Sequence, residues 1–265
     1  MITIRSLTTL DELEDVQQLE RLVWSMEPIP THQTSTAIKN GGMMIGAFDG
    51  DRLVGFNYGF PGFRDGVAYV CSHMMGIDPA YRSRGIGERL KRTQRERALE
   101  LGYTMIHWTF DPLQTRNAYL NLTKLGGVCY TYYPNCYGEM KDGLNAGLPS
   151  DRFEISWHIA SSHVADGFTL PDVARIPLGL YIEHDDGPTL RLALPSSFNA
   201  ACYTLPVLPN IDDVKANDPT LAMKWRMDVR NACMKLFAAG YAIVSLERRD
   251  AYYEYVAVPR DTLHL

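Results

Sequence analysis

The chain has 265 residues, 46% of them hydrophobic and 22% charged, and its formal net charge at pH 7 is -5. This length allows one large domain or two small ones with buried cores, and the composition excludes disordered, collagen-like and miniature scaffold proteins. No apolar run approaches the roughly 18 residues that a membrane span needs, and the N-terminus lacks the features of a signal peptide. We therefore expect a soluble, cytoplasmic protein with no membrane partner.

The five cysteines are widely spaced, and no two of them form a C-x-x-C pair. This pattern argues against a disulfide framework and against a tetrahedral metal site, so we expect reduced thiols and no metal. The net acidity argues against nucleic acid as a partner, because binding to phosphates needs an extended basic surface.

The N-terminal third alternates between strand and helix patterns. Residues 2–5 predict a short strand, and apolar residues recur at helical spacing over residues 10–23. Residues 43–48 and 53–59 predict a hairpin, because the Asp-Gly-Asp sequence at 49–51 supplies the positive φ angles of a tight turn.

A strand, a loop and a basic helix follow. Residues 66–77 have the content of a strand, Asp78 and Pro79 end it, and a helix begins near Ile86 and stops at Gly102. Seven of the chain's 26 Lys and Arg residues fall between residues 82 and 97. A glycine-containing turn that leads into a helix N-terminus presents unpaired N–H groups at the positive end of the helix dipole, which is a phosphate-binding arrangement.

The loop differs from two common phosphate-binding motifs. Gly87 is followed by Glu88 and Arg89 rather than the Lys-Ser/Thr of a Walker A loop, and Leu90 occupies the position of the third glycine of a dinucleotide fingerprint. The loop does fit the pattern Q/R-x-x-G-x-G/A, in which the three fixed positions are Arg82, Gly85 and Gly87.

That pattern is the pyrophosphate-binding signature of the GNAT-type acyltransferase superfamily, which the chain resembles over about its first 140 residues. A strand pattern at 103–110 and a helix at 117–126 that ends in Lys-x-Gly follow in the family's order. The resemblance implies an α/β (α+β) fold with a mixed, mostly antiparallel central sheet flanked by helices. It also implies transfer of an acyl group from an acyl-CoA, either acetyl-CoA or succinyl-CoA, to an amine, without a metal.

The resemblance also assigns cofactor contacts. The backbone near Met75 and Ile77 would bind pantetheine, and a backbone N–H near Met75 would stabilise the oxyanion. Arg89, Lys91 or Arg92 would meet the 3′-phosphate. The expected cofactor-binding residues are Met75, Ile77, Arg82, Ser83, Arg84, Gly85, Ile86, Gly87, Glu88, Arg89 and Asn117.

The acceptor amine must lose a proton, and the sequence leaves the base open. The candidates that would reach the cleft are His73, His107, Asp111, Tyr130, Tyr132, Tyr137 and Glu139. Asp111 precedes Pro112 and is equally suited to form a turn or to cap the next helix. We name His73 and Asp111 as the catalytic candidates.

The chain departs from the family at one position. Many members carry a tyrosine two residues before the lysine of Lys-x-Gly, where it can protonate the departing thiolate, and this chain carries Leu122. Tyr119 lies three residues earlier and would share a helix face with that position, so it is a candidate substitute. Alternatively Tyr119 only packs, and solvent protonates the thiolate. Asn117 or Asn121 would still be able to hydrogen-bond the cofactor.

The second half lies outside the common GNAT core. We expect an acyl-CoA-binding domain at 1–140, a linker at 141–152 and a C-terminal α+β domain at 153–265. A helix that begins at Asp218 and Pro219 and ends at Gly240, followed by a hairpin, repeats the order at 115–137. The C-terminal part is therefore either an extension or a degenerate second half of the same fold.

Arg226 and Arg230 lie four residues apart on the face of that helix. They are placed either to clamp a substrate carboxylate or to form ion pairs with groups such as Asp228 and Glu247, and we name Arg226 as a candidate substrate-binding residue.

The whole chain resembles a subgroup of large predicted GNAT proteins through the phrases W-T-F-D-P-L, N-A-Y-L-N-L, L-P-S-D-R and L-A-x-x-W-R. This resemblance implies an N-acyltransferase acting on a small-molecule amine, such as a free amino acid. The alternative is a sensor or assembly protein that binds CoA without turning it over. Exposed strands and a second domain are consistent with a homodimer.

Overall fold

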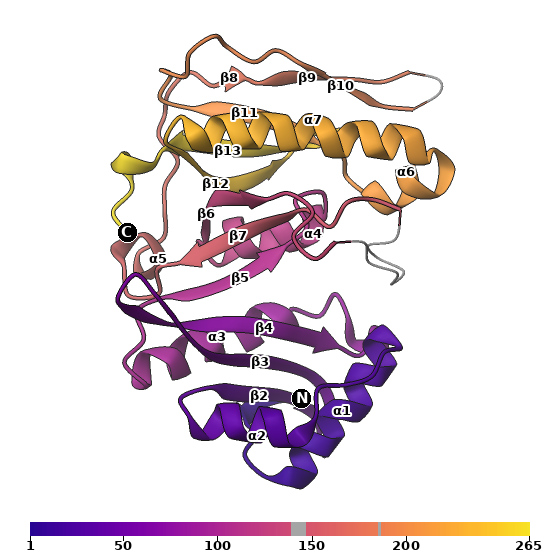
Figure 1. The fold of residues 1–265 in the computed structure, drawn as a ribbon, viewed down its shortest axis with the longest axis vertical. Helices are drawn as coiled ribbons and strands as arrows, with labels where there is room; N and C mark the ends of the chain where they lie inside the picture. Colours follow the sequence, from indigo (N-terminus) through magenta and orange to yellow (C-terminus); the bar gives the residue numbers. More distant parts are fainter. Residues whose placement is uncertain (139–146, 185–186) are drawn as a thin grey trace. The chain divides into compact units, whose positions relative to one another are not determined.

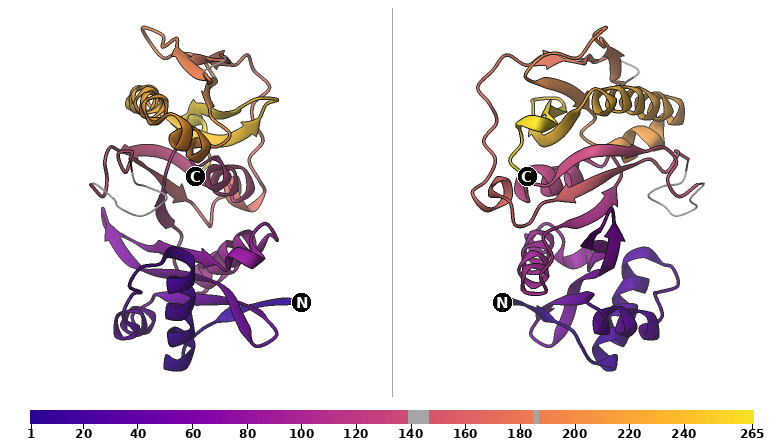
Figure 2. Two further views of the ribbon diagram at one scale, coloured as in Figure 1. Left: turned by 90° about the vertical axis from the view of Figure 1, so that its right-hand side faces the viewer. Right: turned by 60° about the vertical axis from the view of Figure 1, so that its left-hand side comes forward.

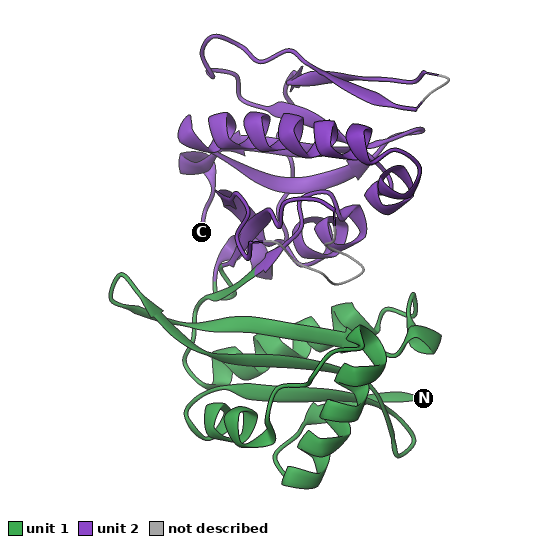
Figure 3. Ribbon diagram, turned by 45° about the vertical axis from the view of Figure 1, so that its right-hand side comes forward, with its two compact units in different colours: residues 1–108, 158–160 green, residues 109–157, 161–265 purple. Residues whose placement is uncertain are grey.

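The computed structural model describes residues 1–138, 147–184 and 187–265. These residues divide into two compact units, shown in Figure 3. Unit 1 comprises residues 1–108 and 158–160, and unit 2 comprises 109–157 and 161–265. The division falls within a strand, at residue 108 rather than near the expected boundary at 140. Each unit is a mixed α/β structure with helices packed on a largely antiparallel sheet.

Unit 1 is built on a sheet in the order β1-β2-β3-β4-β5 (Figure 1). The first four strands pair antiparallel in sequence, and β4 and β5 pair in parallel. The strands are β1 (Ile2–Ser6), β2 (Met43–Asp49), β3 (Arg52–Arg64), β4 (Val67–Ile77) and β5 (Ile106–Phe110). The helices are α1 (Leu10–Trp24), α2 (Thr31–Lys39), η1 (Pro79–Tyr81) and α3 (Ile86–Glu100).

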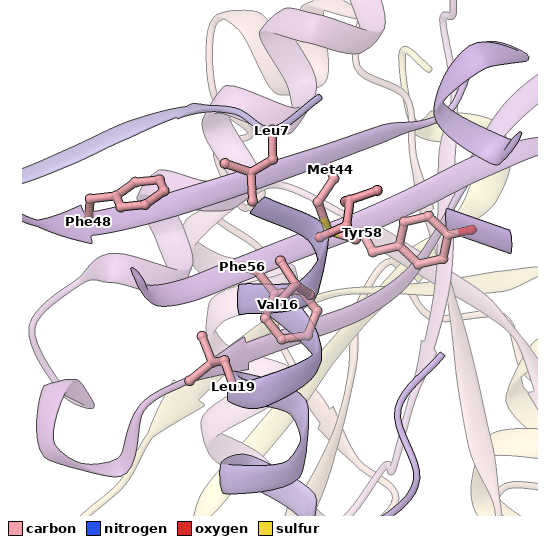
Figure 4. Packing of buried hydrophobic residues seen from close by; sticks show 8 residues of the cluster. Leu7, Val16, Leu19, Met44, Phe48, Phe56 and Tyr58 are labelled. Carbon is pink, nitrogen blue, oxygen red and sulfur yellow. The ribbon is translucent and has the colours of Figure 1, made fainter. Parts of the chain in front are cut away.

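The core of unit 1 lies between α1 and one face of the sheet (Figure 4). Leu13, Val16 and Leu19 follow one another at helical spacing and pack against Phe56 and Tyr58, which alternate along β3. The opposite face of the sheet carries α3, as Figure 2 shows. The strands and helices expected at the N-terminus are therefore confirmed, and the hairpin turn contains Gly50 at φ 59°.

Unit 2 contains a sheet in the order β7-β6-β12-β13-β11-β8 and a separate β9–β10 hairpin. Its strands are β6 (Val128–Tyr133), β7 (Arg152–Trp157), β8 (Ile176–Pro177), β9 (Gly179–Ile182), β10 (Thr189–Leu192), β11 (Tyr203–Val207), β12 (Tyr241–Arg248) and β13 (Tyr253–Pro259). Its helices are α4 (Thr115–Ala118), η2 (Tyr119–Lys124), α5 (Ser162–Ala165), α6 (Ile211–Asn217), α7 (Pro219–Ala238) and η3 (Arg260–Thr262).

The long helix α7 begins and ends where the sequence predicted. Asp218 accepts hydrogen bonds from the N–H groups of Thr220 and Leu221, and Gly240 follows the helix at φ 87°. Figure 1 shows α7 lying along strands of the unit 2 sheet. Phe237 of α7 packs against Phe153 of β7, with 5.7 Å between the ring centroids.

The described end of the expected linker is part of the core. Ser150 is 1% exposed and Asp151 is fully buried. The Asp151 carboxylate accepts hydrogen bonds from the Tyr132 hydroxyl and the Asn135 N–H group. At this end of the expected linker, a polar turn-forming residue accepts hydrogen bonds from its neighbours within the fold.

Candidate functional site

The ladder between β4 and β5 is short and ends well before β4 does. The two parallel strands pair at Val70 with Ile106 and at Cys71 with His107. β4 then continues for six residues to Ile77, and β5 also continues. The term β4–β5 opening refers below to residues 72–77 of β4 and Trp108 of β5, which follow the last pair of this ladder within unit 1.

A bulge lies in β4 at the start of the opening. Tyr58 pairs with Met74 and Gly59 pairs with Ser72, so His73 is an extra residue without a partner in the β3 register. Ser72 hydrogen-bonds Gln94 of α3, whereas the His73 ring lies 6.2 Å from the Tyr58 ring on the α1 side. The bulge places His73 two residues after the last β4–β5 pair, with its ring near Tyr58 of β3, a feature that the strand pattern alone did not predict.

The loop beyond β4 leads its backbone into α3. Asp78 caps the turn η1 through the N–H group of Ala80 and forms an ion pair with Arg52 at 2.8 Å. Ser83 and Gly85 adopt φ angles of 65° and 73°. Successive N–H groups in such a conformation form a concave anion site.

The N-terminus of α3 is open among the described residues, because Gly85 at the N-cap has no side chain to accept from the helix N–H groups. α3 has 15 residues, and its dipole places partial positive charge at this end. The second glycine, Gly87, is buried against Met75 and Ile77 of β4.

Three exposed arginines surround this loop. Arg82 donates to the carbonyl of Ile77 at 3.3 Å, and Arg84 donates to the carbonyl of Ala80 at 3.0 Å. Arg89 donates to the carbonyl of Ile2 at 2.9 Å. Because backbone carbonyls are neutral, the charges of these side chains are available to an anion at the loop.

Two other expected 3′-phosphate contacts are placed differently. Lys91 is 3% exposed and faces the core, where burial lowers its pKa to about 7, so the expectation for this residue is wrong. Lys91 lies four residues after the buried Gly87 and three before the buried Gln94, so it shares their face of α3. Arg92 is exposed and makes two hydrogen bonds with the Glu88 carboxylate.

The comparison with family models identifies this segment. Residues 10–126, which include the opening, the loop and α3, match the acetyltransferase (GNAT) family. These residues form a GNAT acetyltransferase domain. The resemblance drawn from Arg82, Gly85 and Gly87 is thereby confirmed, and the domain belongs to a family of enzymes.

Solved structures that match the chain include three N-acetyltransferases. The ribosomal-protein-S18-alanine N-acetyltransferase of Escherichia coli is 15% identical, and the match covers 66% of this chain and 99% of that one with a TM-score of 0.48. An N-acetyltransferase of Staphylococcus aureus Mu50 is 15% identical, and the match covers 60% of this chain and 99% of that one with a TM-score of 0.49. Arabidopsis thaliana Naa50, in complex with the bisubstrate analogue CoA-Ac-MVNAL, is 16% identical, and the match covers 58% of this chain and 97% of that one with a TM-score of 0.47. Among curated proteins, none matches the sequence.

Two histidines of the GNAT domain lie where the strands separate. The His73 ring also lies 5.6 Å from the Phe60 ring, and partial burial lowers the pKa of His73 below its ordinary 6.5. A neutral imidazole at pH 7 can accept a proton. His107 belongs to the last β4–β5 pair, and its ring meets the edge of the Tyr69 ring at 4.8 Å.

Asp111 and Arg226 form a bidentate ion pair within unit 2. The Nη1–Oδ1 distance is 2.8 Å, the Nη2–Oδ2 distance is 2.5 Å, and Arg226 is 1% exposed. Asp111 also accepts from the N–H group of Leu113, so it forms the turn that was its alternative role. The two nitrogens expected to clamp a substrate carboxylate are therefore held by Asp111.

The ion pairs of α7 differ from those expected. Arg230 pairs with the buried Asp151 at 2.6 Å. Neither Asp228 nor Glu247 is the partner of Arg226 or Arg230. Asp228 pairs with Lys224, and Glu247 pairs with Arg175 and Arg249. The sequence indicated ion pairing but not the partners, because these come from segments about 80 and 115 residues earlier in the chain.

The remaining tyrosine candidates for the base have other contacts. The Tyr132 hydroxyl donates to Asp151 at 2.5 Å, and burial raises its pKa well above the ordinary value. The Tyr137 hydroxyl lies 2.8 Å from the Thr109 hydroxyl, and the Tyr130 ring lies beneath the Arg260 guanidinium. Glu139 lies outside the described residues.

The expected helix at 117–126 is short and continues as a π-helical turn. α4 ends at Ala118 and η2 covers Tyr119–Lys124. Tyr119 is 39% exposed, whereas Leu122 is 1% exposed, so the expectation of a shared face is wrong. The reason is the wider i to i+5 turn, in which positions three apart no longer superpose. Asn117 is exposed and Asn121 is buried.

The described residues contain no group of three or more His, Cys, Asp or Glu side chains arranged to hold a metal ion. No helix in the described parts of the chain is both long and apolar enough to cross a membrane.

Proposed function

We propose that the GNAT domain binds an acyl-CoA along the β4–β5 opening and catalyses direct transfer of its acyl group to an amine. The observation that carries the proposal is the opening itself, at whose β4 end a loop with two left-handed residues leads into the uncapped helix α3. The end of β4 without β5 pairing has room for the extended pantetheine arm, and the N–H groups of the loop can bind a pyrophosphate.

The chain's own residues divide the work of binding. The N–H groups of residues 83–88 bind the pyrophosphate, and Arg82 and Arg84 add charge-assisted hydrogen bonds. Arg89, which is exposed one turn further along α3, accounts for the 3′-phosphate. Backbone groups of Met75 and Ile77, which lie beyond the last β4–β5 pair, orient the pantetheine. When bound, the acyl-CoA supplies the activated thioester.

His73 is the base that we favour. It is the bulged residue at the opening, and its lowered pKa keeps the imidazole neutral and able to take a proton from the amine at neutral pH. Asp111 is less suited to this role, because both of its oxygens accept hydrogen bonds from Arg226. Tyr119 remains a candidate acid, since its side chain is exposed.

We further propose that the acceptor is the amine of a small molecule, such as an amino acid, and that the donor is acetyl-CoA or succinyl-CoA. The support is the resemblance of phrases such as W-T-F-D-P-L and L-P-S-D-R to the large GNAT subgroup. A cytoplasmic location and a homodimer both stay hypotheses.

Binding of CoA to the full chain tests the cofactor site. Arg82→Glu is expected to weaken CoA binding about ten- to a hundredfold in calorimetry, because it removes a charge-assisted contact and adds repulsion. Gly85→Leu is expected to weaken it as well. Arg97→Glu is the matched control, since Arg97 lies in the last turn of α3 and pairs with Glu100. Unchanged affinity in both loop variants would overturn this placement.

Turnover tests the reaction. Release of free thiol from acetyl-CoA and from succinyl-CoA is measured against a panel of L- and D-amino acids and polyamines. We expect brisk release with at least one pair, and a slower rate in His73→Gln at unchanged CoA affinity. CoA binding without release for any pair would replace the enzyme with the CoA-binding sensor.

A further inference from the structure

Lys91 bridges β4 and β5 at the point where they separate. Its Nζ donates to the Ser72 hydroxyl at 2.7 Å and lies 3.6 Å from the centroid of the Trp108 ring. The last pair of the ladder joins Cys71 of β4 to His107 of β5. Ser72 directly follows Cys71, and Trp108 directly follows His107. Directly beyond the last pair, the two strands are therefore connected through the contacts of the Lys91 ammonium group with Ser72 and Trp108.

The surroundings of this ammonium are polar but hold no countercharge. Gln94 Oε1 accepts hydrogen bonds from Ser72 at 2.8 Å and from Asn57 at 3.3 Å, and lies 3.5 Å from Nζ. Among the described residues, no carboxylate lies within ion-pair distance of Lys91. The groups that face it are Asn57 of β3, Ser72 and Cys71 of β4, Gln94 of α3 and Trp108 of β5, and the one titratable group among them is the Cys71 thiol.

A buried cation without a countercharge costs free energy, so this arrangement is unfavourable for folding alone. The same burial lowers the pKa of Lys91 to about 7, and both protonation states are therefore populated near neutrality. The attraction to the indole face exists only for the cation, and it is strongest when water is excluded. Trp108 is 8% exposed and Lys91 is 3% exposed.

We propose that Lys91 is a positioning residue for the cofactor site, whose ammonium holds Trp108 of β5 to Ser72 of β4 and so sets the width of the β4–β5 opening. This inference rests on the proposed binding of acyl-CoA in that opening. Loss of the proton removes the attraction to Trp108 while the hydrogen bond to Ser72 can persist. Cofactor affinity therefore decreases as the pH rises through neutrality.

The contact between Lys91 and Trp108, called the clamp below, is tested without any ligand. The tryptophan fluorescence of the full chain is titrated from pH 5.5 to 8.5, and the contribution of Trp108 is taken as the difference from Trp108→Phe. We expect this contribution to change with a midpoint near 7 and to be constant in Lys91→Met. Lys91→Gln provides a second neutral variant. The inference would be overturned if the Trp108 signal did not titrate in the wild type. It would also be overturned if the signal titrated in both neutral variants as it does in the wild type.

Its effect on the cofactor is tested by calorimetry at pH 6 and pH 8.5. In the wild type, we expect the affinity for CoA to fall between pH 6 and pH 8.5 by a factor that is about fivefold or more larger than in Lys91→Met. Titration of the phosphates of CoA itself is the same for both proteins and therefore cancels in this comparison. Adenosine 3′,5′-bisphosphate, which lacks the pantetheine arm, should bind both proteins equally. A pH profile for CoA that is identical in the two proteins would refute the positioning role.

The two proposals fail in different ways. If Arg82→Glu leaves the affinity for CoA unchanged, the cofactor site is misplaced, even where the fluorescence titration shows the clamp. If Arg82→Glu weakens binding but the profiles of the wild type and Lys91→Met coincide, the cofactor site stands and the role of Lys91 fails.

Discussion

At the scale of single residues, backbone conformation and ion pairing explain more than residue type does. Ser83 and Gly85 both adopt the left-handed conformation in the loop that leads into α3, although Ser83 carries a side chain and Gly85 does not. Gly87, the second glycine of the motif, does not adopt this conformation, and it packs against β4 with room for a Cβ atom.

The two motif glycines are expected to respond differently to alanine. Gly85→Ala forces a side chain into a left-handed conformation at φ 73° and should lower the free energy of unfolding by about 1–2 kcal/mol. A Cβ at Gly87 would lie 3.4 Å from Met75 and Ile77, an ordinary contact, so Gly87→Ala should leave stability unchanged or raise it by up to about 1 kcal/mol. Urea unfolding of both variants measures the contrast, and equal destabilisation would contradict this account.

The pair between Arg226 and Asp111 is expected to dominate the charge energetics of α7. Arg226→Met removes the bidentate partner of the nearly buried Asp111 and leaves it only the longer 4.0 Å contact with Arg152, so it should cost up to about 3–5 kcal/mol. Lys224→Met on the same helix removes the exposed pair with Asp228 and should cost at most about 1 kcal/mol. Thermal and urea unfolding provide the comparison. If the two variants lose similar stability, the buried pair does not have the weight given to it here.

At the scale of elements, short-range hydrogen bonds set where the helices begin. Thr9 and Glu12 form a capping box at the start of α1, and the Glu12 carboxylate also pairs with Arg5. These contacts outweigh the effect of partial burial and lower the pKa of Glu12 from 4.5 to about 2.

The sign of the resulting pH dependence follows from that lowered pKa. Because the folded state holds the proton less tightly than the unfolded state, Glu12 stabilises the fold above pH 4.5, and this contribution is lost as the pH falls towards 2. Glu12→Gln should therefore be less stable than the wild type by about 1 kcal/mol at pH 6, and the difference should vanish near pH 2. Unfolding curves at pH 6, 4 and 2.5 test this, and a difference that grows on acidification would contradict it.

At the scale of the whole molecule, one order of elements occurs twice within unit 2. In unit 2, η2, Gly126, β6 and β7 precede the matching series α7, Gly240, β12 and β13, and the two hairpins meet through antiparallel β6 and β12. This recurrence supports the hypothesis of a degenerate second half. Among the described residues of the second half, we find no counterpart of the basic loop at 82–89.

Global stability should also depend on the proton of Lys91. Its pKa is about 7 in the folded state and near 10.5 when the chain unfolds, so the unfolded state binds more protons between these values and stability rises with pH across that window. Lys91→Met lacks the cost of the buried charge and should be about 1–4 kcal/mol more stable than the wild type at pH 6. The gap should narrow by pH 9.5 in urea unfolding. A variant that is less stable than the wild type at pH 6 would show that the charge is fully compensated.

Much of unit 1 and of the loop at residues 82–87 could be predicted from the sequence because the signals are local. Asp78 and Pro79 end a strand, Gly85 permits a positive φ, and apolar spacing fixes α1, so each pattern acts within a few residues. The base and the substrate contacts could not be predicted in this way. Whether Asp111 is a base or the partner of Arg226 depends on two segments 115 residues apart.

The sequence by itself therefore determined the GNAT domain, the loop that leads into α3 and the ends of α7, since capping, turn chemistry and periodicity are short-range effects. Only the tertiary structure decided that Lys91 faces inward, that His73 is bulged and that Asp151 belongs to the core. Those outcomes depend on strand register and on burial, which arise from contacts between distant parts of the chain. The basic run within an acidic protein, visible from composition, is thus divided by the fold into exposed arginines at the loop and one buried lysine at the start of the opening.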